Sequence, residues 1–391
     1  MLITDAQFKA SLAVIRSLGK RNIRITAGSE IKSALGLFSK YCKKKIIYPN
    51  PRTNTAQFLK YIQNIVKKED FDCIIPFHTY TTFLLYKYKD MFIDYTKIPP
   101  PDFNIFIKAY DKKRLLKIAS TNNIYCPKTY FSDDINELKT QIKQYPIIIK
   151  PSIRHGVQIA KCKNSKELKE NYTKMNDRYG PCIVQEYIPN GDELGVYTLF
   201  DYNSNPIALT VQKRVRTITN DGGISTYRVT VKNQNLVNIS FKLLKKLKWS
   251  GVAMIEFRID KRDGIPKLME INPRFWGSLQ LSIFSGVDFP YLLYNLIINK
   301  DIPSSLYFKD GVQCRWLVGD ITSFFKCPNK IMTIGSYLKP NLNFDVISLK
   351  DTIPGLVSIF SPIRHSYDDE QREEEIETKN VLKNENLTNI S

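Results

Sequence analysis

Hydrophobic and polar positions in the first hundred residues alternate between two periods. Apolar side chains three or four positions apart, such as Phe8, Leu12 and Ile15, are typical of an amphipathic helix, whereas short apolar runs are typical of strands. Helices are predicted at 8–18, 33–41, 55–68 and 81–88. Strands are predicted at 22–26, 45–48 and 72–76. Strands that alternate with helices favour a parallel sheet with right-handed crossovers.

Three consecutive prolines, Pro99–Pro101, interrupt this pattern and mark the first expected domain boundary. Beyond them, helices are predicted at 104–122 and 165–178, and apolar strands at 145–151 and 182–187. The first of these strands carries one lysine, Lys150, close to its end. The second strand stops at Pro189-Asn190-Gly191, a sequence typical of a turn.

From Glu193 onward the pattern predicts longer antiparallel strands around one helix. The strands are expected at 193–201, 206–213, 226–231, 252–260 and 266–271, and the helix at 234–248. The chain therefore reads as an α/β part followed by an α+β part. No G-x-G-x-x-G follows the first predicted strand, which speaks against a nicotinamide-cofactor domain.

The strongest chemical signal is a predicted hairpin with two facing carboxylates. A three-residue loop, Arg262-Asp263-Gly264, would pair residues whose numbers sum to 526 and so place Glu256 opposite Glu270. Asn272 shares a strand face with Glu270, because side chains alternate with period two. Oxygen ligands without His or Cys suit Mg²⁺ or Mn²⁺, usually completed by substrate phosphates. The alternative is a pair of solvated glutamates, but Glu270 lies between apolar neighbours.

A metal that binds polyphosphate requires cationic groups nearby, and two lysines are candidates. Lys150 ends its apolar strand, and Lys112 comes early in the preceding helix. Each also has a simpler interpretation: Lys112 on a solvated helix face, and Lys150 extending from a strand end to solvent. Residues 181–193 form a strand end and connector whose backbone groups could bind an adenine edge.

Taken together, these segments resemble the ATP-grasp superfamily, over roughly residues 1–320. The matching motifs, in order, are Asp-Lys at 111–112, Ile-Ile-Lys-Pro at 148–151, Gln-Glu-Tyr-Ile-Pro-Asn-Gly-Asp-Glu at 185–193, Ile-Glu-Phe at 255–257 and Met-Glu-Ile-Asn-Pro-Arg at 269–274. The similarity is greatest to the carboxylate–amine ligase, or carboligase-like, branch. The resemblance implies an ATP-grasp fold with an N-terminal Rossmann-like pre-grasp domain.

The resemblance also implies four parts and a role for each motif residue. The parts are a pre-grasp domain (1–100), a small lid subdomain with its linking helix (101–190), a large antiparallel subdomain with the magnesium site (191–325), and a C-terminal extension whose acidic end is expected to be disordered (326–391). Lys112 and Lys150 would contact ATP; Glu186, Tyr187 and Ile188 would bind adenine; Glu193 would hold the ribose; Glu256, Glu270 and Asn272 would bind Mg²⁺; and Arg274 would stabilise the transferring phosphoryl group.

Several further residues are candidates for contacts with the substrate. Arg214 and Arg216, two positions apart on one predicted strand, suit recognition of a carboxylate or acyl phosphate together with the loop 222–226, although a solvated basic strand is the alternative. His78 to Thr82 follow the carboxyl end of a strand, where ligands bind in parallel sheets. Trp276 is expected either to line the pocket or to pack in the core.

The loop after Lys150 departs from the superfamily pattern. Residues 152–157 are shorter than the usual glycine-rich flap and contain a single glycine. Arg154 or His155 could replace the missing backbone donors. Otherwise the flap is weak, which puts efficient turnover in doubt.

The amino-acid composition limits the classes of binding partner and the cellular compartment to be expected. Lys and Arg number 58 against 38 Asp and Glu, a net charge of +20, which favours anionic partners. Tyr and Phe lie in apolar runs like core residues, which speaks against a general nucleic-acid-binding protein. Seven cysteines without a C-x-x-C pair argue for a reducing cytoplasm. No membrane span, signal peptide or amphipathic anchor is expected, and a homodimer is one expectation from the resemblance.

The sequence thus predicts an ATP- and Mg²⁺-dependent ligase. It would activate a small-molecule carboxylate as an acyl phosphate and join it to an amine, releasing ADP and phosphate. Two alternatives stay open: an ATP-driven carboxylase or acyl activator of the same fold, and a non-catalytic nucleotide- or RNA-binding regulator.

Overall fold

The first part of the chain forms a four-stranded parallel sheet flanked by helices. A computed structural model describes residues 1–391 except 154–158, 220–221, 328–334, 336, 338–342 and 361–391. The sheet has the order β3-β2-β1-β4, from β1 (Leu2–Ile3), β2 (Thr26–Ser29), β3 (Lys44–Ile47) and β4 (Ile74–Ile75). Its helices are α1 (Lys9–Gly19), α2 (Thr55–Lys68) and α3 (Thr79–Lys87), with short 3₁₀ turns at Leu35–Phe38 and Lys89–Met91. The predicted parallel α/β arrangement is confirmed.

Three details of this part differ from the sequence prediction. The strand expected at 22–26 begins only at Thr26, because Asn22 adopts a left-handed conformation in a turn that follows α1. The helix expected at 33–41 is a single 3₁₀ turn. The central strand β1 was not predicted at all, since its two buried residues at the start of the chain are too few to show a period.

The predicted helix 104–122 is two helices, α4 (Phe103–Tyr110) and α5 (Lys112–Thr121). Asp111 has an extended backbone and ends α4, and its carboxylate accepts hydrogen bonds from the N–H groups of Lys113 and Arg114. Asp111 is therefore the N-cap of α5. This break makes Lys112 the first residue of a helix rather than a residue within one.

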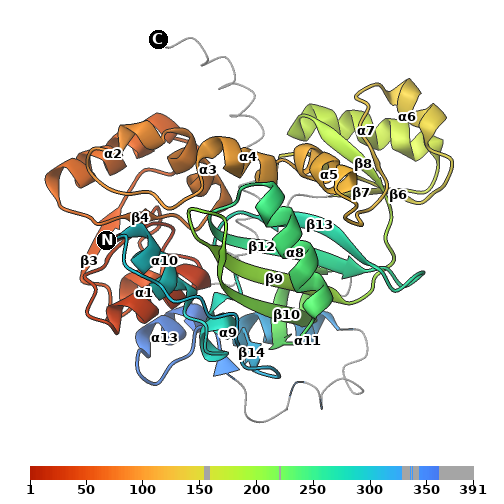
Figure 1. Cartoon of the computed structure of the whole chain (residues 1–391). Helices are drawn as coiled ribbons and strands as arrows, with labels where there is room; N and C mark the ends of the chain where they lie inside the picture. The colour runs from red at the N-terminus through yellow and green to blue at the C-terminus, as the bar shows by residue number, and fades with distance from the viewer. Residues whose placement is uncertain (154–158, 220–221, 328–334, 336, 338–342, 361–391) are drawn as a thin grey trace.

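A small antiparallel sheet follows, at the upper right of Figure 1. It has the order β5-β8-β6-β7 and comprises β5 (Thr129–Tyr130), β6 (Ile147–Pro151), β7 (Ala160–Cys162) and β8 (Cys182–Glu186). Helices α6 (Ile135–Gln141) and α7 (Ser165–Tyr179) accompany it. Together they share a separate apolar core that includes Leu138, Ile149 and Leu168.

A seven-stranded sheet forms the centre of the molecule (Figure 1). Its order is β13-β12-β9-β10-β11-β14-β15. The strands are β9 (Glu193–Phe200), β10 (Pro206–Thr219), β11 (Gly222–Thr230), β12 (Gly251–Ile259), β13 (Pro266–Asn272), β14 (Gln313–Arg315) and β15 (Asn343–Phe344). Helices α8 (Gln234–Lys246), α9 (Leu279–Phe284) and α10 (Phe289–Ile297) lie beside it. Strands β10 and β11 extend further toward their shared turn than the sequence predicted.

Two departures from the predicted geometry of the β12–β13 hairpin cancel each other. Ile259 pairs with Pro266, and the Asp260 N–H donates to the Ile265 carbonyl, so residues 261–264 form a four-residue loop instead of the predicted three. A bulge at Met269 then shifts the register by one residue. The shift restores the predicted pairing of Glu256 with Glu270.

The chain finally returns to the N-terminal part. After β14 come α11 (Leu317–Lys326), β15 and α13 (Ile353–Phe360). Figure 1 shows α13 below α1, far from the small sheet. Asp351 accepts hydrogen bonds from the Arg16 Nε (2.9 Å) and the Ser39 hydroxyl (2.8 Å), so buried polar contacts hold this segment. The acidic stretch predicted to be disordered lies outside the described residues.

The N-terminal part and the large sheet share one apolar core. It includes Ile3 and Val14 from the first part and Val196, Trp249 and Ile271 from the second. The proline segment that follows the N-terminal part packs just as closely against the large sheet. A Cβ on Gly251 would lie 2.2 Å from the Pro100 carbonyl oxygen, and Gly251 has a positive φ. Among the described residues, no helix is long and apolar enough to cross a bilayer.

Candidate active site

Two carboxylates and an amide converge on one face of the β12–β13 hairpin. Glu256 and Glu270 are paired residues of the ladder. The Asn272 Nδ2 lies 3.1 Å from the Glu256 Oε1 and 3.2 Å from the Glu270 Oε1. The structure therefore brings together the three residues that the sequence singled out for the metal.

Lys112 approaches this group from the start of α5. Its Nζ lies 3.4 Å from the Glu270 Oε2, and the residue is only 3% exposed. The Lys112 N–H donates to the Ser152 carbonyl (2.8 Å), and the Ser152 hydroxyl donates to the Asp111 carboxylate (2.5 Å). These bonds fix the helix start to the end of β6.

The charges of Lys112 and Glu270 also act on Lys150, which lies on β6. Burial lowers the pKa of Lys150 to about 8, and the neighbouring Lys112 charge contributes to the shift, while Glu270 opposes it. Burial also lowers the pKa of Lys112. Two lysines that are partly desolvated near each other gain stability from an anion such as a phosphate.

Arg214 connects the carboxylates on the other side. Its guanidinium donates to the Glu256 Oε2 (2.7 Å) and the Glu193 Oε2 (2.9 Å), and Arg258 donates to the second oxygen of Glu193. Burial raises the pKa of Glu256, with Glu270 contributing and Arg214 opposing. Burial alone would raise the pKa of Glu193 too, but Arg214 and Arg258 hold it below its ordinary value.

The donor set fits a divalent cation. Two facing carboxylates repel each other and place oxygens on one patch, and an amide supplies a neutral oxygen. Here the amide nitrogen of Asn272 stands between the carboxylates, as expected for a side chain that meets two anions. A cation in that place would favour the reversed amide, with its oxygen inward. In the described part of the chain, no group of three or more His, Cys, Asp or Glu side chains is arranged to hold a metal ion, so the candidate set consists of two carboxylates and an amide.

The residues predicted to bind adenine follow β8. The Glu186 carboxylate accepts hydrogen bonds from the Lys128 N–H and the Arg262 guanidinium, both at 2.9 Å. The Tyr187 N–H donates to the Pro146 carbonyl (3.2 Å), and Ile188 is 2% exposed. These contacts place the three residues at the junction of the small sheet with the hairpin loop. Their role toward adenine stays a prediction.

Arg214 and Arg216 do not form the expected pair. A register shift separates them on β10. Arg214 contacts the carboxylates of the candidate site, whereas Arg216 donates to Asp320 (2.7 and 3.0 Å) and stacks 3.5 Å from the ring centre of Tyr337. The period-two argument failed because a bulge interrupts the alternation of side chains.

Arg274 and Trp276 continue the chain beyond the metal motif. The Arg274 Nε donates to the Thr79 hydroxyl (2.7 Å), so the hairpin is connected to the loop after β4. Trp276 is 1% exposed and packs between Tyr197 and Phe289, which settles it as a core residue. The residues of the flap at 154–158, with Arg154 and His155, lie outside the described residues.

Sequence reasoning missed two charged residues of this region. Arg258 lies two positions after Glu256 on a strand, so the same alternation could have identified it. Asp320 comes from α11, about a hundred residues after its partner Arg216, and nothing in the local sequence indicated the contact.

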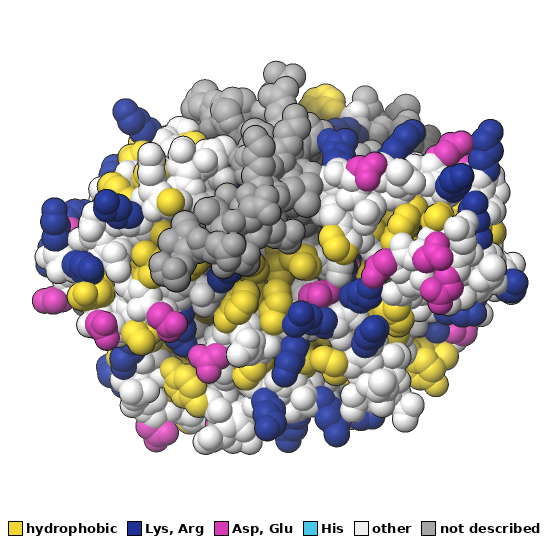
Figure 2. Space-filling model, turned by 90° about the horizontal axis from the view of Figure 1, so that it is seen from above, with side chains coloured by type: hydrophobic (Ala, Val, Ile, Leu, Met, Phe, Trp, Pro, Cys, Tyr) yellow, Lys and Arg dark blue, Asp and Glu magenta, His cyan; other side chains and the backbone are white. Residues whose placement is uncertain are grey.

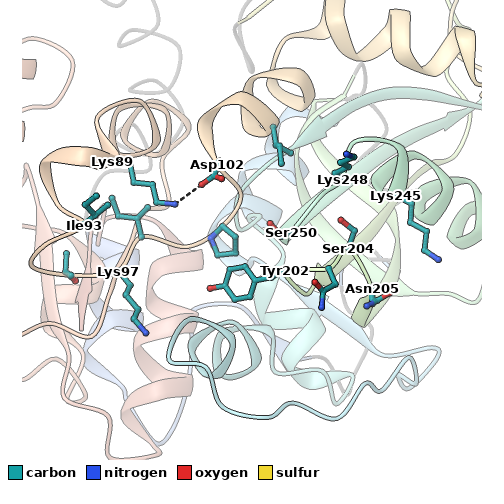
Figure 3. Close-up of a pocket in the computed structure, with 15 residues that line it drawn as sticks. Lys89, Ile93, Lys97, Asp102, Tyr202, Ser204, Asn205, Lys245, Lys248 and Ser250 are labelled. Atoms are coloured by element: carbon teal, nitrogen blue, oxygen red, sulfur yellow. Dashed lines mark hydrogen bonds and ion pairs between the residues drawn. The ribbon is translucent and has the colours of Figure 1, made fainter.

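A larger groove of about 880 Å³ lies elsewhere, between residues 89–105 and the β9–β10 turn. Figure 3 shows that its lysines point in different directions. Lys89 pairs with Asp102 (3.0 Å), and Lys97 donates to the Ile297 carbonyl (3.0 Å). The groove contains none of the candidate site residues, and we interpret it as a polar seam between the two parts.

Known proteins are similar to this chain in sequence and in fold. A family model described as "ATP-grasp in the biosynthetic pathway with Ter operon" matches residues 178–319. The fold is similar to that of the biotin carboxylase domain of 2-oxoglutarate carboxylase from Hydrogenobacter thermophilus (TM-score 0.69, 17% identity, 80% of this chain and 72% of that one). The chain is thus similar to ATP-grasp proteins in sequence over residues 178–319 and in fold over most of its length.

Solved structures of similar fold differ in the activity for which they are named. N5-carboxyaminoimidazole synthetase from Staphylococcus aureus aligns with a TM-score of 0.65 at 13% identity, over 86% of this chain and 84% of that one. L-amino acid ligase from Bacillus licheniformis aligns with a TM-score of 0.58 at 17% identity, over 78% and 75%.

One curated relative shows sequence similarity as well. D-alanine–D-alanine ligase from Acetivibrio thermocellus is 26% identical over 204 residues, which is 46% of this chain and 53% of that protein. The match thus spans about half the length of this relative.

Proposed function

We propose that this protein is an ATP-grasp enzyme that acts as an ATP-dependent carboxylate–amine ligase. The observation that carries the proposal is the hairpin face of Glu256, Glu270 and Asn272, with Lys112 directly against it. Carboxylates that can hold a cation lie next to the buried Lys112 and the half-buried Lys150, which can bind phosphates, and this combination suits a nucleoside triphosphate. The curated relative and one structural neighbour are named as ligases of amino acids, which supports C–N bond formation.

The mechanism follows from the groups present. Lys112 and Lys150 would bind ATP phosphates, and Glu256, Glu270 and Asn272 would hold Mg²⁺ or Mn²⁺. The metal, when bound, neutralises phosphate charge. Arg214 orients Glu256, and Arg274 would stabilise the phosphoryl group in transfer.

A carboxylate oxygen of the substrate attacks the γ-phosphorus, and the bond to ADP breaks. An amine then attacks the acyl carbon, phosphate leaves, and the nitrogen loses a proton. The reaction needs no side-chain nucleophile, because phosphoryl transfer is catalysed mainly by positioning the reactants and neutralising the phosphate charge.

The remaining assignments are proposals of the same kind. We assign ATP adenine and ribose to Glu186, Tyr187, Ile188 and Glu193, and we expect the protein to act in the cytoplasm, as a homodimer, with a small carboxylate and amine as substrates. The four parts divide at residues 100, 190 and 325. Figure 2 shows Lys and Arg scattered among acidic and hydrophobic side chains on the face in view, which gives no support to a nucleic-acid-binding stripe.

ADP release tests the proposal. Purified protein is incubated with Mg-ATP and pooled carboxylates, with and without pooled amino acids and polyamines. Release that requires both pools is expected, and Glu270→Ala should abolish it. Glu170→Ala, which removes an exposed glutamate on α7, should keep full activity.

Two results would contradict the ligase assignment. Release with carboxylates alone would favour the acyl activator or, with bicarbonate, the carboxylase that several structural neighbours are named for. Full turnover by Glu270→Ala would show that the metal site is wrongly assigned.

A further inference from the structure

Just beyond Arg274, one exposed residue interrupts a buried turn. Trp276 and Ser278 are buried, whereas Gly277 between them is exposed. Apart from its chain neighbours, a Cβ built on Gly277 would meet no described atom closer than the Lys9 Cε at 3.6 Å, an ordinary van der Waals distance. Gly277 also lacks the positive φ that favours glycine. Neither packing nor backbone therefore requires a glycine here, and the space above it is open on the side of Lys9.

Lys9 reaches this space from the first turn of α1, which Figure 1 shows close to α9, the helix that begins after the turn. The Lys9 Nζ donates to the Asp345 Oδ2 (3.0 Å) and lies 4.6 Å from the ring centre of Trp316. Among the described residues, no other side chain bonds to this ammonium group. An ammonium group has three N–H donors, and the Lys9 side chain is 13% exposed. At least one donor therefore remains for a ligand.

The charges around Lys9 do not balance. Arg228, on β11, is 2% exposed and donates to the same Asp345 oxygen at 2.5 Å. Within the described part of the chain, Asp345 is the single carboxylate that pairs with either cation. Burial lowers the pKa of Lys9 to about 8; Asp345 opposes this shift and Arg228 adds to it. One carboxylate for two cations leaves a surplus positive charge, which an anion beside Lys9 would balance.

This group of charges adjoins the proposed reaction centre. Arg228 lies directly opposite Arg214 in the ladder of β10 and β11, and Arg214 bonds to Glu256, so all three lie on one face of the sheet. On the other side, Arg274 precedes Gly277 by three residues. Burial raises the pKa of Glu256 and the Arg274 charge opposes that shift, so Arg274 is also near the carboxylates. A substrate that reacts at Arg274 has the open space above Gly277 next to it.

We propose that Lys9, beside the open space above Gly277, binds a carboxylate of the substrate other than the one that is phosphorylated. Two sources present this group: a dicarboxylate as the acid to be activated, and an amino acid as the amine. The carboxylate accepts a hydrogen bond from Lys9 and balances the surplus charge, while Asp345 keeps both of its cations. The assignment of the ligand as substrate rests on the proposed function; the binding itself does not.

Trace acetylation of lysines tests the subsite without turnover. The full-length protein is treated briefly with acetic anhydride, and mass spectrometry compares the labelling of Lys9 with that of Lys143, an exposed lysine between α6 and β6. Succinate, glutarate, glycine, β-alanine, ethylamine, inorganic phosphate and Mg-ATP are added singly at equal ionic strength. A carboxylate ligand at about ten times its Kd should lower the relative labelling of Lys9 about tenfold, since mass action leaves about a tenth of the sites free. Ethylamine, which has no carboxylate, should not.

Gly277→Val tests the open space itself. The valine side chain fills it and should abolish the protection of Lys9, whereas the Tm should stay nearly unchanged because a Cβ meets no clash there. Gly355→Ala is the matched control, since its Cβ would also make only ordinary contacts, 3.6 Å from the Ile347 Cα on α13. That variant should keep the protection.

A kinetic comparison follows once ADP release has identified a substrate. Lys9→Met should raise the KM of the substrate that carries the second carboxylate by about tenfold, with little change in kcat, because a hydrogen bond to a charged group is lost. Lys9→Arg should recover part of the loss. A purely structural role of Lys9 would lower the Tm of Lys9→Met and leave the KM unchanged.

The remaining results separate the possible assignments. Protection by the dicarboxylates alone supports an acid with two carboxylates, and protection by the amino acids alone supports an amino-acid amine. Protection only by phosphate or Mg-ATP would assign Lys9 to the nucleotide and overturn the proposal, as would no protection by any ligand or full protection in Gly277→Val. Protection by a carboxylate without ADP release from any pool would refute the proposed function and leave the subsite standing. ADP release that requires both pools, with Lys9 unprotected, would do the reverse.

Discussion

At the scale of single residues, the predicted pairing of Glu256 with Glu270 is correct, although the loop from which it was predicted has a different length. The predicted three-residue loop is a four-residue loop, and the bulge at Met269 offsets the error, so Glu256 still faces Glu270. A sequence period locates residues on a strand but does not reveal a bulge, which depends on packing. The same limit explains why Arg216 contacts Asp320 and not the partners of Arg214.

The pKa of Lys150 predicts a pH dependence of ATP binding. Its pKa is lowered to about 8, so the free lysine is charged below that pH and loses its charge above it. A bound phosphate favours the charged form, so ATP affinity should fall above pH 8, by up to about tenfold per pH unit. Calorimetric titration between pH 7 and 9.5 measures this. Lys150→Arg stays charged and should flatten the profile; equal profiles in both proteins would remove Lys150 from the site.

The facing carboxylates predict a metal effect on stability. Glu256 and Glu270 repel each other without a cation, and burial already raises the pKa of Glu256. Mg²⁺ should therefore raise the Tm of the wild-type protein, since binding to the folded state alone stabilises it. Glu256→Gln should abolish this Mg²⁺-dependent shift, which is taken relative to the Tm of the same variant in EDTA because the substitution also weakens the ion pair with Arg214. A Mg²⁺ shift that survives in Glu256→Gln would place the cation elsewhere.

At the scale of elements, periodicity found the long helices and strands and failed where one residue decides. The helix 55–68 agrees with α2 residue for residue. The predicted helix 104–122 breaks because the Asp111 side chain caps α5, an event that a helical period does not show. Strand β1 has only two residues, and its place at the centre of the sheet comes from its neighbours on both sides.

Asp111, which separates α4 from α5, also helps to position the candidate active site. Asp111→Ala removes the N-cap of α5 and the acceptor of the Ser152 hydroxyl, so it should lower the free energy of unfolding by about 1–2 kcal/mol. Because Lys112 is the next residue, ATP affinity should fall as well. Urea unfolding and ATP titration measure the two effects. Asp134→Ala, which removes the N-cap of α6, should affect stability alone. Loss of affinity in both variants would mean that the effect is global.

At the scale of the whole molecule, the sequence predicted the motifs in order but not how the last segment closes the fold. Residues 320–365 carried no recognisable motif, yet they supply β15 and buried acids that contact α1. Asp345 pairs with Lys9 at 3.0 Å, across more than three hundred residues of sequence. Contacts of this kind leave no local pattern, because each partner alone resembles an ordinary surface charge.

The pair of Arg16 and Asp351 gives the sharpest test of this closure. Both side chains are buried, and Asp351 also accepts from the Lys40 N–H at 2.9 Å. Asp351→Ala leaves the Arg16 charge buried without its carboxylate, so the free energy of unfolding should fall by about 3–5 kcal/mol. The double variant Arg16→Met with Asp351→Ala should recover part of the loss, because it removes the stranded charge. Asp102→Ala, whose exposed carboxylate pairs with Lys89, should change stability by about 1 kcal/mol or less. If Asp351→Ala were as mild as Asp102→Ala, the C-terminal segment would not be a structural part of the N-terminal half of the fold.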